Sequence, residues 1–155
     1  MIFNIIKNSR FKLIKNKKKN ISKNKFEEYK SEFKNFYDEA NTKLQQFKLN
    51  DWKVTFDYAK RRAGACIYSK KELSFSIYFL RNSSSFDLND TLLHEISHAL
   101  VGPNQGHNNI WKKKALSIGC TGKVYHSLNF SNPGWIKYCS NLCWEQTCYR
   151  RKQNL

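Results

Sequence analysis

The chain has 155 residues, the size of one ordinary domain, and 40% of them are hydrophobic, so it can bury a core. No apolar run is long enough for a transmembrane helix, which excludes a helical membrane protein from the expected classes. The formal net charge of +16 favours anionic partners such as nucleic acid, although a lysine-rich composition without a partner is the alternative.

The start of the chain does not resemble a secretion signal, because the apolar stretch MIFNII is short and is interrupted by Asn4. We therefore expect an intracellular, cytoplasmic protein, or a nuclear one if the source is eukaryotic. In that setting, five cysteines indicate metal ligands or free thiols before disulfides.

Residues 1–25 are rich in Lys and Arg and contain no acidic residue, so we expect a mobile basic arm without a core of its own. From Phe26 to Leu49 the apolar residues recur at spacings of three and four. This pattern predicts one amphipathic helix with an aromatic stripe facing the core.

Three strands are predicted next, over residues 52–58, 65–69 and 73–79, because apolar and polar side chains alternate in the first and the last. The turn between the first two contains Gly64, for which we expect a positive φ. Short connections between consecutive strands predict a three-stranded antiparallel meander.

Two helices follow the strands. The first is expected over 88–101, with Asp87 as N-cap and Gly102 at its end. The second is expected over 109–118, with Asn108 as N-cap. Beyond it the regular pattern fades, so the order of elements predicts a small α+β domain.

The first of these helices carries the sequence HEISH. His94 and His98 lie one turn apart on the same face, so both imidazoles can reach one ion. Glu95 lies one residue further round and can approach a water at that ion without binding the ion itself. Two nitrogen ligands and a general base on one rigid element are what H-E-x-x-H provides. Solvent-exposed side chains without a metal are the weaker alternative.

A catalytic zinc ion needs a third protein ligand and an open fourth position. His107 is the obvious candidate, because glycines and a proline let its loop fold back towards the helix. His126 is an alternative ligand and Tyr125 a conceivable oxyanion partner, but nothing in the sequence fixes either position. Eight residues separate His98 from His107, which excludes the metzincin pattern.

TLLHEISHAL, then GPNQGH, then a Trp followed by basic residues and a helix ending in IGC, resembles the SprT-like domain, the metallopeptidase module of the Spartan type. The upstream segment WKVTFDYAKRRAGACIYSKKELSFSIYFL is similar to the strand region of that family. The resemblance covers residues 33–120 and is most specific at HEISHAL and G-H-x-x-x-W.

The resemblance implies a zincin fold and a zinc-dependent endopeptidase, with His94, His98 and His107 as zinc ligands and Glu95 as catalytic base. In better-known members the substrates are proteins bound or crosslinked to DNA, and DNA contact activates cleavage. We therefore expect a protein substrate and a DNA partner, and no membrane. A non-catalytic zinc-containing DNA-binding protein is the alternative, and a hydrolase of a non-protein substrate a weaker one; the intact Glu95 argues against the former.

Residues 26–120 form the predicted metallopeptidase domain, and 121–155 form a basic tail similar to half of the zinc ribbon that many SprT-like proteins carry. A second, structural zinc ion is one interpretation of its cysteines, and free thiols are the one we favour. The candidate ligands are Cys139, Cys143 and Cys148, with Cys120 as a fourth.

Two further residues have an expected place in the core. Trp111, four residues past His107, either packs in the core or walls the site, and we favour core packing. Cys66, in a predicted strand, is expected to act as a small buried apolar residue.

Overall fold

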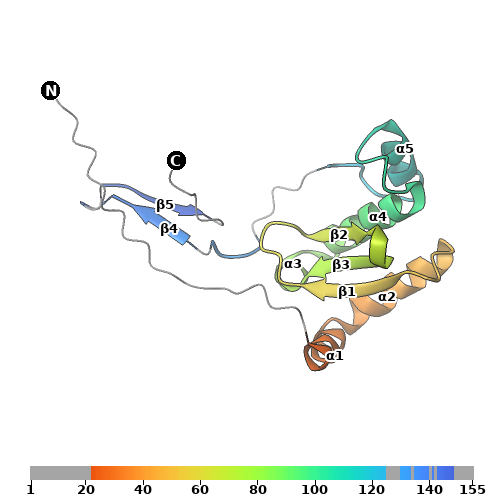
Figure 1. Ribbon diagram of the computed structural model, residues 1–155, viewed down its shortest axis with the longest axis horizontal. Helices are drawn as coiled ribbons and strands as arrows, with labels where there is room; N and C mark the ends of the chain where they lie inside the picture. The colour runs from red at the N-terminus through yellow and green to blue at the C-terminus, as the bar shows by residue number, and fades with distance from the viewer. Residues whose placement is uncertain (1–21, 125–129, 134, 140, 142, 149–155) are drawn as a thin grey trace. The chain divides into compact units, whose positions relative to one another are not determined.

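The computed structural model describes residues 22–124, 130–133, 135–139, 141 and 143–148. A helical pair is followed by a three-stranded sheet and three further helices, which confirms the α+β class (Figure 1). The elements are α1 (Lys23–Glu32), α2 (Lys34–Gln46), β1 (Lys53–Asp57), β2 (Gly64–Ile67), the 3-10 helix η1 (Tyr68–Lys70), β3 (Glu72–Ser76), α3 (Ile77–Asn82), α4 (Ser85–Val101) and α5 (Asn109–Ser117). The strands β4 (Trp135–Tyr138) and β5 (Glu145–Cys148) pair as a hairpin in a compact unit separate from residues 22–131.

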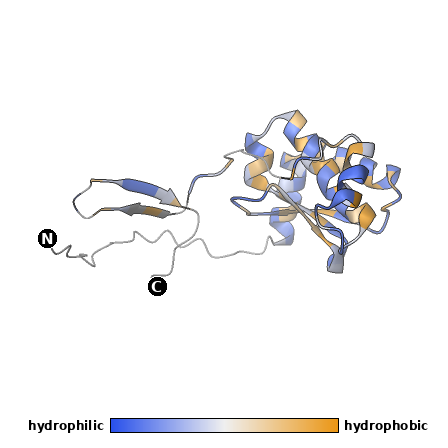
Figure 2. Cartoon of the chain, turned by 90° about the horizontal axis from the view of Figure 1, so that it is seen from above, coloured by the Kyte–Doolittle hydropathy of each residue, from blue (hydrophilic) through white to orange (hydrophobic). Residues whose placement is uncertain are grey.

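The aromatic stripe lies on two helices and not on the single helix predicted over 26–49. Phe33 ends α1 and precedes α2, with φ −106° and ψ 33°. The apolar residues of the stripe from Phe26 to Phe47 repeat every 3.5 positions on average. A stripe with this repeat drifts around a straight helix by about 20° per heptad. The break at Phe33 lets both helices keep their apolar faces on the core. Figure 2 shows that helices of the chain carry both hydrophobic and hydrophilic residues, as expected of amphipathic helices.

The predicted antiparallel meander is wrong in its strand order. β3 lies in the centre, parallel to β1 and antiparallel to β2, so the order is β1-β3-β2. β2 is therefore an edge strand, and its other side lies against α4 (Figure 1). The sheet is mixed because the chain crosses from β1 over to the far edge before it returns to the centre.

The alternation in the segment predicted as a strand over 73–79 was misleading. Ser74 and Ser76 are buried, because their hydroxyls donate to Asp57 Oδ2 at 2.6 Å and to the carbonyl oxygen of Ala59 at 2.5 Å. β3 is thus covered on both faces, as a central strand should be. The Ser76 hydroxyl also accepts from the backbone N–H of Phe79, so residues 77–82 form α3 and not the end of a strand.

The helix that carries HEISH begins one turn earlier than predicted. Ser84, and not Asp87, is its N-cap: the Ser84 hydroxyl accepts from the Asp87 backbone N–H and donates to the Asp87 carboxylate. The helix ends at Gly102, as predicted, with φ 87°. Asn108 is confirmed as N-cap of α5, since its Oδ1 accepts from the first backbone N–H groups of that helix.

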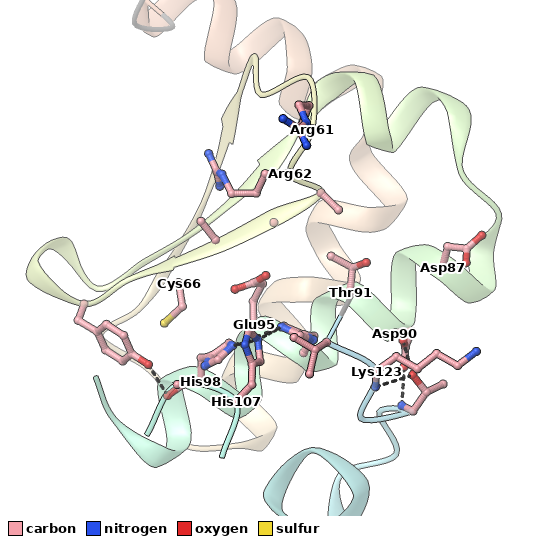
Figure 3. A pocket seen from close by; sticks show the side chains of 18 of the residues that line it. Arg61, Arg62, Cys66, Asp87, Asp90, Thr91, Glu95, His98, His107 and Lys123 are labelled. Atoms are coloured by element: carbon pink, nitrogen blue, oxygen red, sulfur yellow. Dashed lines mark hydrogen bonds between the residues drawn. The ribbon is translucent and has the colours of Figure 1, made fainter. Parts of the chain in front are cut away.

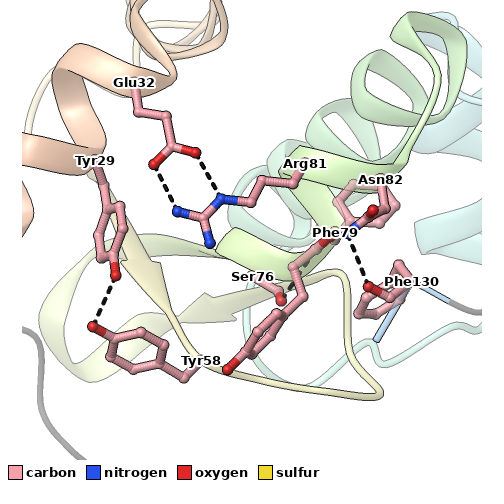
Figure 4. A network of polar contacts seen from close by, with 9 residues as sticks. Tyr29, Glu32, Tyr58, Ser76, Phe79, Arg81, Asn82 and Phe130 are labelled. Atoms are coloured by element: carbon pink, nitrogen blue, oxygen red, sulfur yellow. Dashed lines mark hydrogen bonds and ion pairs between the residues drawn. The ribbon is translucent and has the colours of Figure 1, made fainter. Parts of the chain in front are cut away.

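A polar network joins α1 and α3 (Figure 4). Arg81 donates to both carboxylate oxygens of Glu32, at 2.6 and 2.8 Å. Asn82 donates to the carbonyl oxygen of Phe130, and the buried Phe130 ring packs edge-on against Phe79. Phe130, which lies in the segment predicted as tail, is therefore part of the main core.

The basic arm predicted over 1–25 lies outside the described residues up to position 21, and the remaining residues enter α1. Among the described residues, no helix combines the length and the apolar character that crossing a membrane requires.

Candidate metal and catalytic site

The three predicted ligand histidines lie together. His94 and His98 project from one face of α4, and His107 reaches them from the loop before α5 (Figure 3). The Nε2 atoms are 3.0 Å apart between His94 and His107, 3.1 Å between His98 and His107, and 3.3 Å between His94 and His98. The structure therefore brings His107 to the helical pair, as its return loop predicted.

Two glycines and one tyrosine set the course of the return loop. Gly102 and Gly106 adopt positive φ values of 87° and 50°, which turn the chain back towards α4. The hydroxyl of Tyr68 lies 3.0 Å from the carbonyl oxygens of both His98 and Gly102. Tyr68, the first residue of η1, thus links the segment after β2 to the C-terminal end of α4, a contact with no signal in the sequence.

The donor set fits a zinc ion. Nitrogens about 2.0–2.1 Å from a tetrahedral zinc ion lie about 3.3–3.4 Å from one another, close to the spacing of the three Nε2 atoms. Burial, together with the neighbouring histidines, lowers the pKa of His98 to about 4, and burial also lowers the pKa of His107. Neutral imidazole is the form that binds a metal. Three imidazole nitrogens suit zinc and other late transition metals.

Glu95 is buried between α4 and the edge strand β2. Burial raises the pKa of its carboxyl to about 7, although the charge of Arg62 and a hydrogen bond from the backbone N–H of Cys66 act in the opposite direction. A carboxyl with such a pKa can accept and release a proton near neutral pH.

Gly64 is needed for a different reason from the one predicted. Its φ is not in the left-handed region. A Cβ atom there would lie 2.8 Å from Cγ and 2.9 Å from Oε1 of Glu95, so only glycine leaves room for the Glu95 side chain. The sequence placed Gly64 in a turn, whereas it is the first residue of β2, so its close approach to Glu95 had no signal in the predicted elements.

The histidines and Glu95 open into a cavity of about 770 Å³ (Figure 3). α4 forms one wall and β2 the other, with the return loop and the segment after α5 completing it. Asp90 fastens that segment: its carboxylate accepts from the backbone N–H and the hydroxyl of Thr121. The rim carries the exposed ring of Phe86 and the basic side chains Arg61, Arg62 and Lys123.

Among the described residues, neither cysteine of the main unit belongs to a cluster of potential metal ligands. Cys66 lines the cavity beside Glu95, and burial raises the pKa of its thiol to about 12. It is half-buried at the edge of the core, so the expected apolar environment is only partly found. Cys120 is buried against Trp111, and burial raises its pKa to about 11. Both thiols therefore stay protonated at neutral pH.

The hairpin does not gather its three cysteines. Cys148 is paired with Trp135 at one end of the ladder. The backbone N–H of Cys139 donates to Trp144 at the other end, where Cys139 and Cys143 hydrogen-bond to each other. Four strand positions correspond to about 13 Å, which is too far for one zinc ion. The two remaining predicted alternatives, Tyr125 and His126, lie outside the described residues.

Two histidines and a buried glutamate on one helix, joined by a third histidine from the return loop beside an edge strand, are the arrangement of a metallopeptidase-like domain. A sequence model of the SprT-like family matches residues 27–131. Because this match covers more than half of the chain, the protein belongs to the SprT-like family, which confirms the resemblance. No curated protein and no solved structure matches the chain.

Proposed function

We propose that the protein is a zinc-dependent metalloendopeptidase, with His94, His98 and His107 as zinc ligands and Glu95 as catalytic base. The observation that carries the proposal is the convergence of three histidine Nε2 atoms within 3.0–3.3 Å, two from the helix that also carries the buried Glu95 and one from the return loop. A purely structural metal site has no use for an acidic side chain beside it in an open cavity.

The bound zinc supplies Lewis-acid chemistry, which makes water more acidic and polarises a carbonyl oxygen. Glu95 accepts the proton of the attacking water as its oxygen bonds to the peptide carbonyl carbon. The protonated Glu95 then delivers that proton to the leaving nitrogen as the carbon–nitrogen bond breaks. Burial raises the pKa of this carboxyl in the metal-free protein, which favours proton uptake, and the Cys66 backbone N–H holds the carboxylate in position.

The edge of β2 supports an extended peptide as the substrate. Ala63 accepts a hydrogen bond from the backbone N–H of Ser76, so the outward-facing backbone groups of the strand belong to Gly64 and Cys66. Because the N–H of Cys66 donates to Glu95, a peptide would pair with the groups of Gly64 and the carbonyl oxygen of Cys66. These groups face the cavity that contains the histidines. A peptide strand that pairs with such an edge gains main-chain hydrogen bonds whatever its sequence. This arrangement favours a broad range of protein substrates.

The test measures zinc per chain and cleavage of an unfolded protein substrate in the full chain, for the wild type and two variants. Glu95→Gln should keep one zinc ion and lose at least about 10²-fold in rate. Glu28→Gln, an exposed glutamate on α1, is the matched control and should behave as the wild type. Undiminished cleavage by Glu95→Gln would contradict the mechanism.

The third ligand is tested in the same way. His107→Ala should lose most of the zinc affinity, whereas His126→Ala should keep it. The reverse result would replace His107 by His126 as ligand. A wild type that binds zinc and cleaves no protein would instead favour the non-catalytic zinc-containing DNA-binding protein.

We further propose that the protein substrates are bound or crosslinked to DNA. The support is the charge of +16, together with the exposed lysines 112–114 on α5, directly after the return loop, and Lys123 on the cavity rim. Replacing lysines 112–114 by glutamine should weaken DNA binding and flatten its salt dependence, and should slow cleavage of a DNA-bound substrate more than that of a free one. Glutamine at Lys34, Lys43 and Lys48 removes equal charge elsewhere and is the control. Equal effects of both triple variants would contradict a DNA contact near the site.

A further inference from the structure

One aromatic residue, Trp111, contacts all three ligand histidines. The centroid of its ring system lies 4.7 Å from the His94 ring, 5.3 Å from the His98 ring and 4.6 Å from the His107 ring. The three imidazole rings make different interplanar angles with the indole. His98 stacks on it at 24°, His107 meets it edge-on at 87°, and His94 is tilted by 60°. A single rigid surface therefore touches every ligand ring, and each in its own orientation.

Trp111 is itself held firmly. It is fully buried, and it packs in a second core cluster with Leu93, Ala115 and Cys120. Its backbone N–H donates to the side chain of the N-cap Asn108, directly after His107. The indole is thus anchored to α4 beside His94 and to the start of α5.

A hydrogen bond from the indole N–H does not account for the position of Trp111. Among the described residues, the buried Trp111 Nε1 has no hydrogen-bond partner. Leaving such a donor without a partner is unfavourable, so the packing of the ring must outweigh this loss. The packing in question is against the apolar cluster on one side and the three imidazoles on the other.

We propose that Trp111 is a positioning residue for the metal site: its ring holds the three imidazoles in the orientation in which their Nε2 atoms face one point. The proposal rests on the proposed function, because it takes the three histidines to be metal ligands. Groups that orient metal ligands without touching the metal commonly change the affinity by about 10- to 100-fold when they are removed. Here an aromatic surface does this for all three ligands at once.

If Trp111 only packed in the core, the experiment would give a different result. Loss of such a residue lowers the stability of the metal-free protein but leaves the affinity of the folded fraction for metal unchanged. A positioning residue changes the affinity and the ligand geometry even in variants that stay folded. Zinc affinity and the visible absorption of the Co²⁺ form separate these two cases, since the Co²⁺ bands depend on the arrangement of the ligands.

The experiment compares wild type, Trp111→Phe, Trp111→Ala and the control Trp144→Phe, an exposed tryptophan in the hairpin. Zinc affinity is measured by competition with a chelator, and folding of each metal-free variant by circular dichroism. We expect Trp111→Ala to bind zinc about 10- to 100-fold more weakly, with altered Co²⁺ bands. Trp111→Phe should recover most of the affinity, and Trp144→Phe should match the wild type. A folded Trp111→Ala with wild-type zinc affinity and Co²⁺ bands overturns the proposal.

A second measurement covers the case in which Trp111→Ala does not fold. Co²⁺ quenches tryptophan emission at short range, and the chain has four tryptophans. Co²⁺ should quench part of the emission of the wild type, of Trp52→Phe and of Trp144→Phe, and this quenching should disappear in Trp111→Phe. Equal quenching in Trp111→Phe overturns the proposal. A wild type that binds neither zinc nor Co²⁺ would refute the proposed function itself, which distinguishes the two failures.

Discussion

The Gly64→Ala substitution tests whether the edge strand sets the position of the catalytic base. A Cβ at position 64 would lie 2.8 Å from Cγ, 2.9 Å from Oε1 and 3.1 Å from Cδ of Glu95. Carbon atoms in ordinary contact are about 3.5–4.0 Å apart, so the Glu95 side chain or the strand must move by about 0.7 Å or more. Because φ of Gly64 lies outside the left-handed region, this collision is the perturbation, and backbone strain is not.

The expected magnitudes follow from that displacement. Overpacking of this size costs about 1–3 kcal/mol in the free energy of unfolding. Displacement of a catalytic group by about 1 Å lowers the rate by about 10²-fold. We therefore expect Gly64→Ala to bind one zinc ion per chain, to unfold more easily and to cleave protein about 100-fold more slowly than the wild type.

A double-mutant cycle provides the sharpest assay. Glu95→Ala removes the three atoms with which the new Cβ would collide. In that background Gly64→Ala should cost little, or stabilise by about 0.4–1 kcal/mol, because alanine restricts the unfolded chain. Denaturant unfolding of the four proteins gives the coupling. An equal loss of stability in both backgrounds, or full activity of Gly64→Ala, would refute the reasoning.

Tyr68→Phe should lower the free energy of unfolding by about 0.5–1.5 kcal/mol and weaken zinc binding several-fold, because the hydroxyl holds two carbonyl oxygens at the end of α4. Tyr58→Phe loses a bond to another tyrosine hydroxyl away from the histidines, so an equal loss of zinc affinity in both variants would contradict this role. Arg81 lowers the pKa of Glu32, so their ion pair stabilises the fold fully above the unfolded pKa of 4.5 and progressively less as the pH falls through the folded pKa. Glu32→Gln should therefore lower the free energy of unfolding at pH 7 by no more than about 1 kcal/mol, and Tm with it. The difference in Tm between wild type and variant should shrink below pH 4.5. The exposed Glu27→Gln is the control; the same pH dependence in both would point to a general charge effect.

Local patterns in the sequence were sufficient to predict the helix and the loop that carry the histidines and Glu95. The spacing of His94 and His98 places them on one helical face, and the Asn108 cap and Gly102 exit bound the return loop that brings His107 to them. These signals depend on residues within one or two turns of each other. They were therefore readable without knowing what each element packs against.

The tertiary structure decided everything that depends on non-local pairing. The parallel pairing of β1 with β3 leaves β2 at the edge of the sheet. Ser74 and Ser76, which the alternation places on the polar face, are buried because their hydroxyls find acceptors on Asp57 and Ala59. Hydrogen-bond partners of this kind come from segments far along the chain, and alternation alone cannot reveal them.

The same holds for the residues that shape the site. Gly64 has no side chain so that Glu95 can lie against β2, and Trp111 faces the core and the three histidines at once. The sequence by itself determined which side chains could bind a metal and act as a base. Only the packing of α4 between β2 and α5 decided how those side chains are oriented, because that packing joins residues which no local pattern connects.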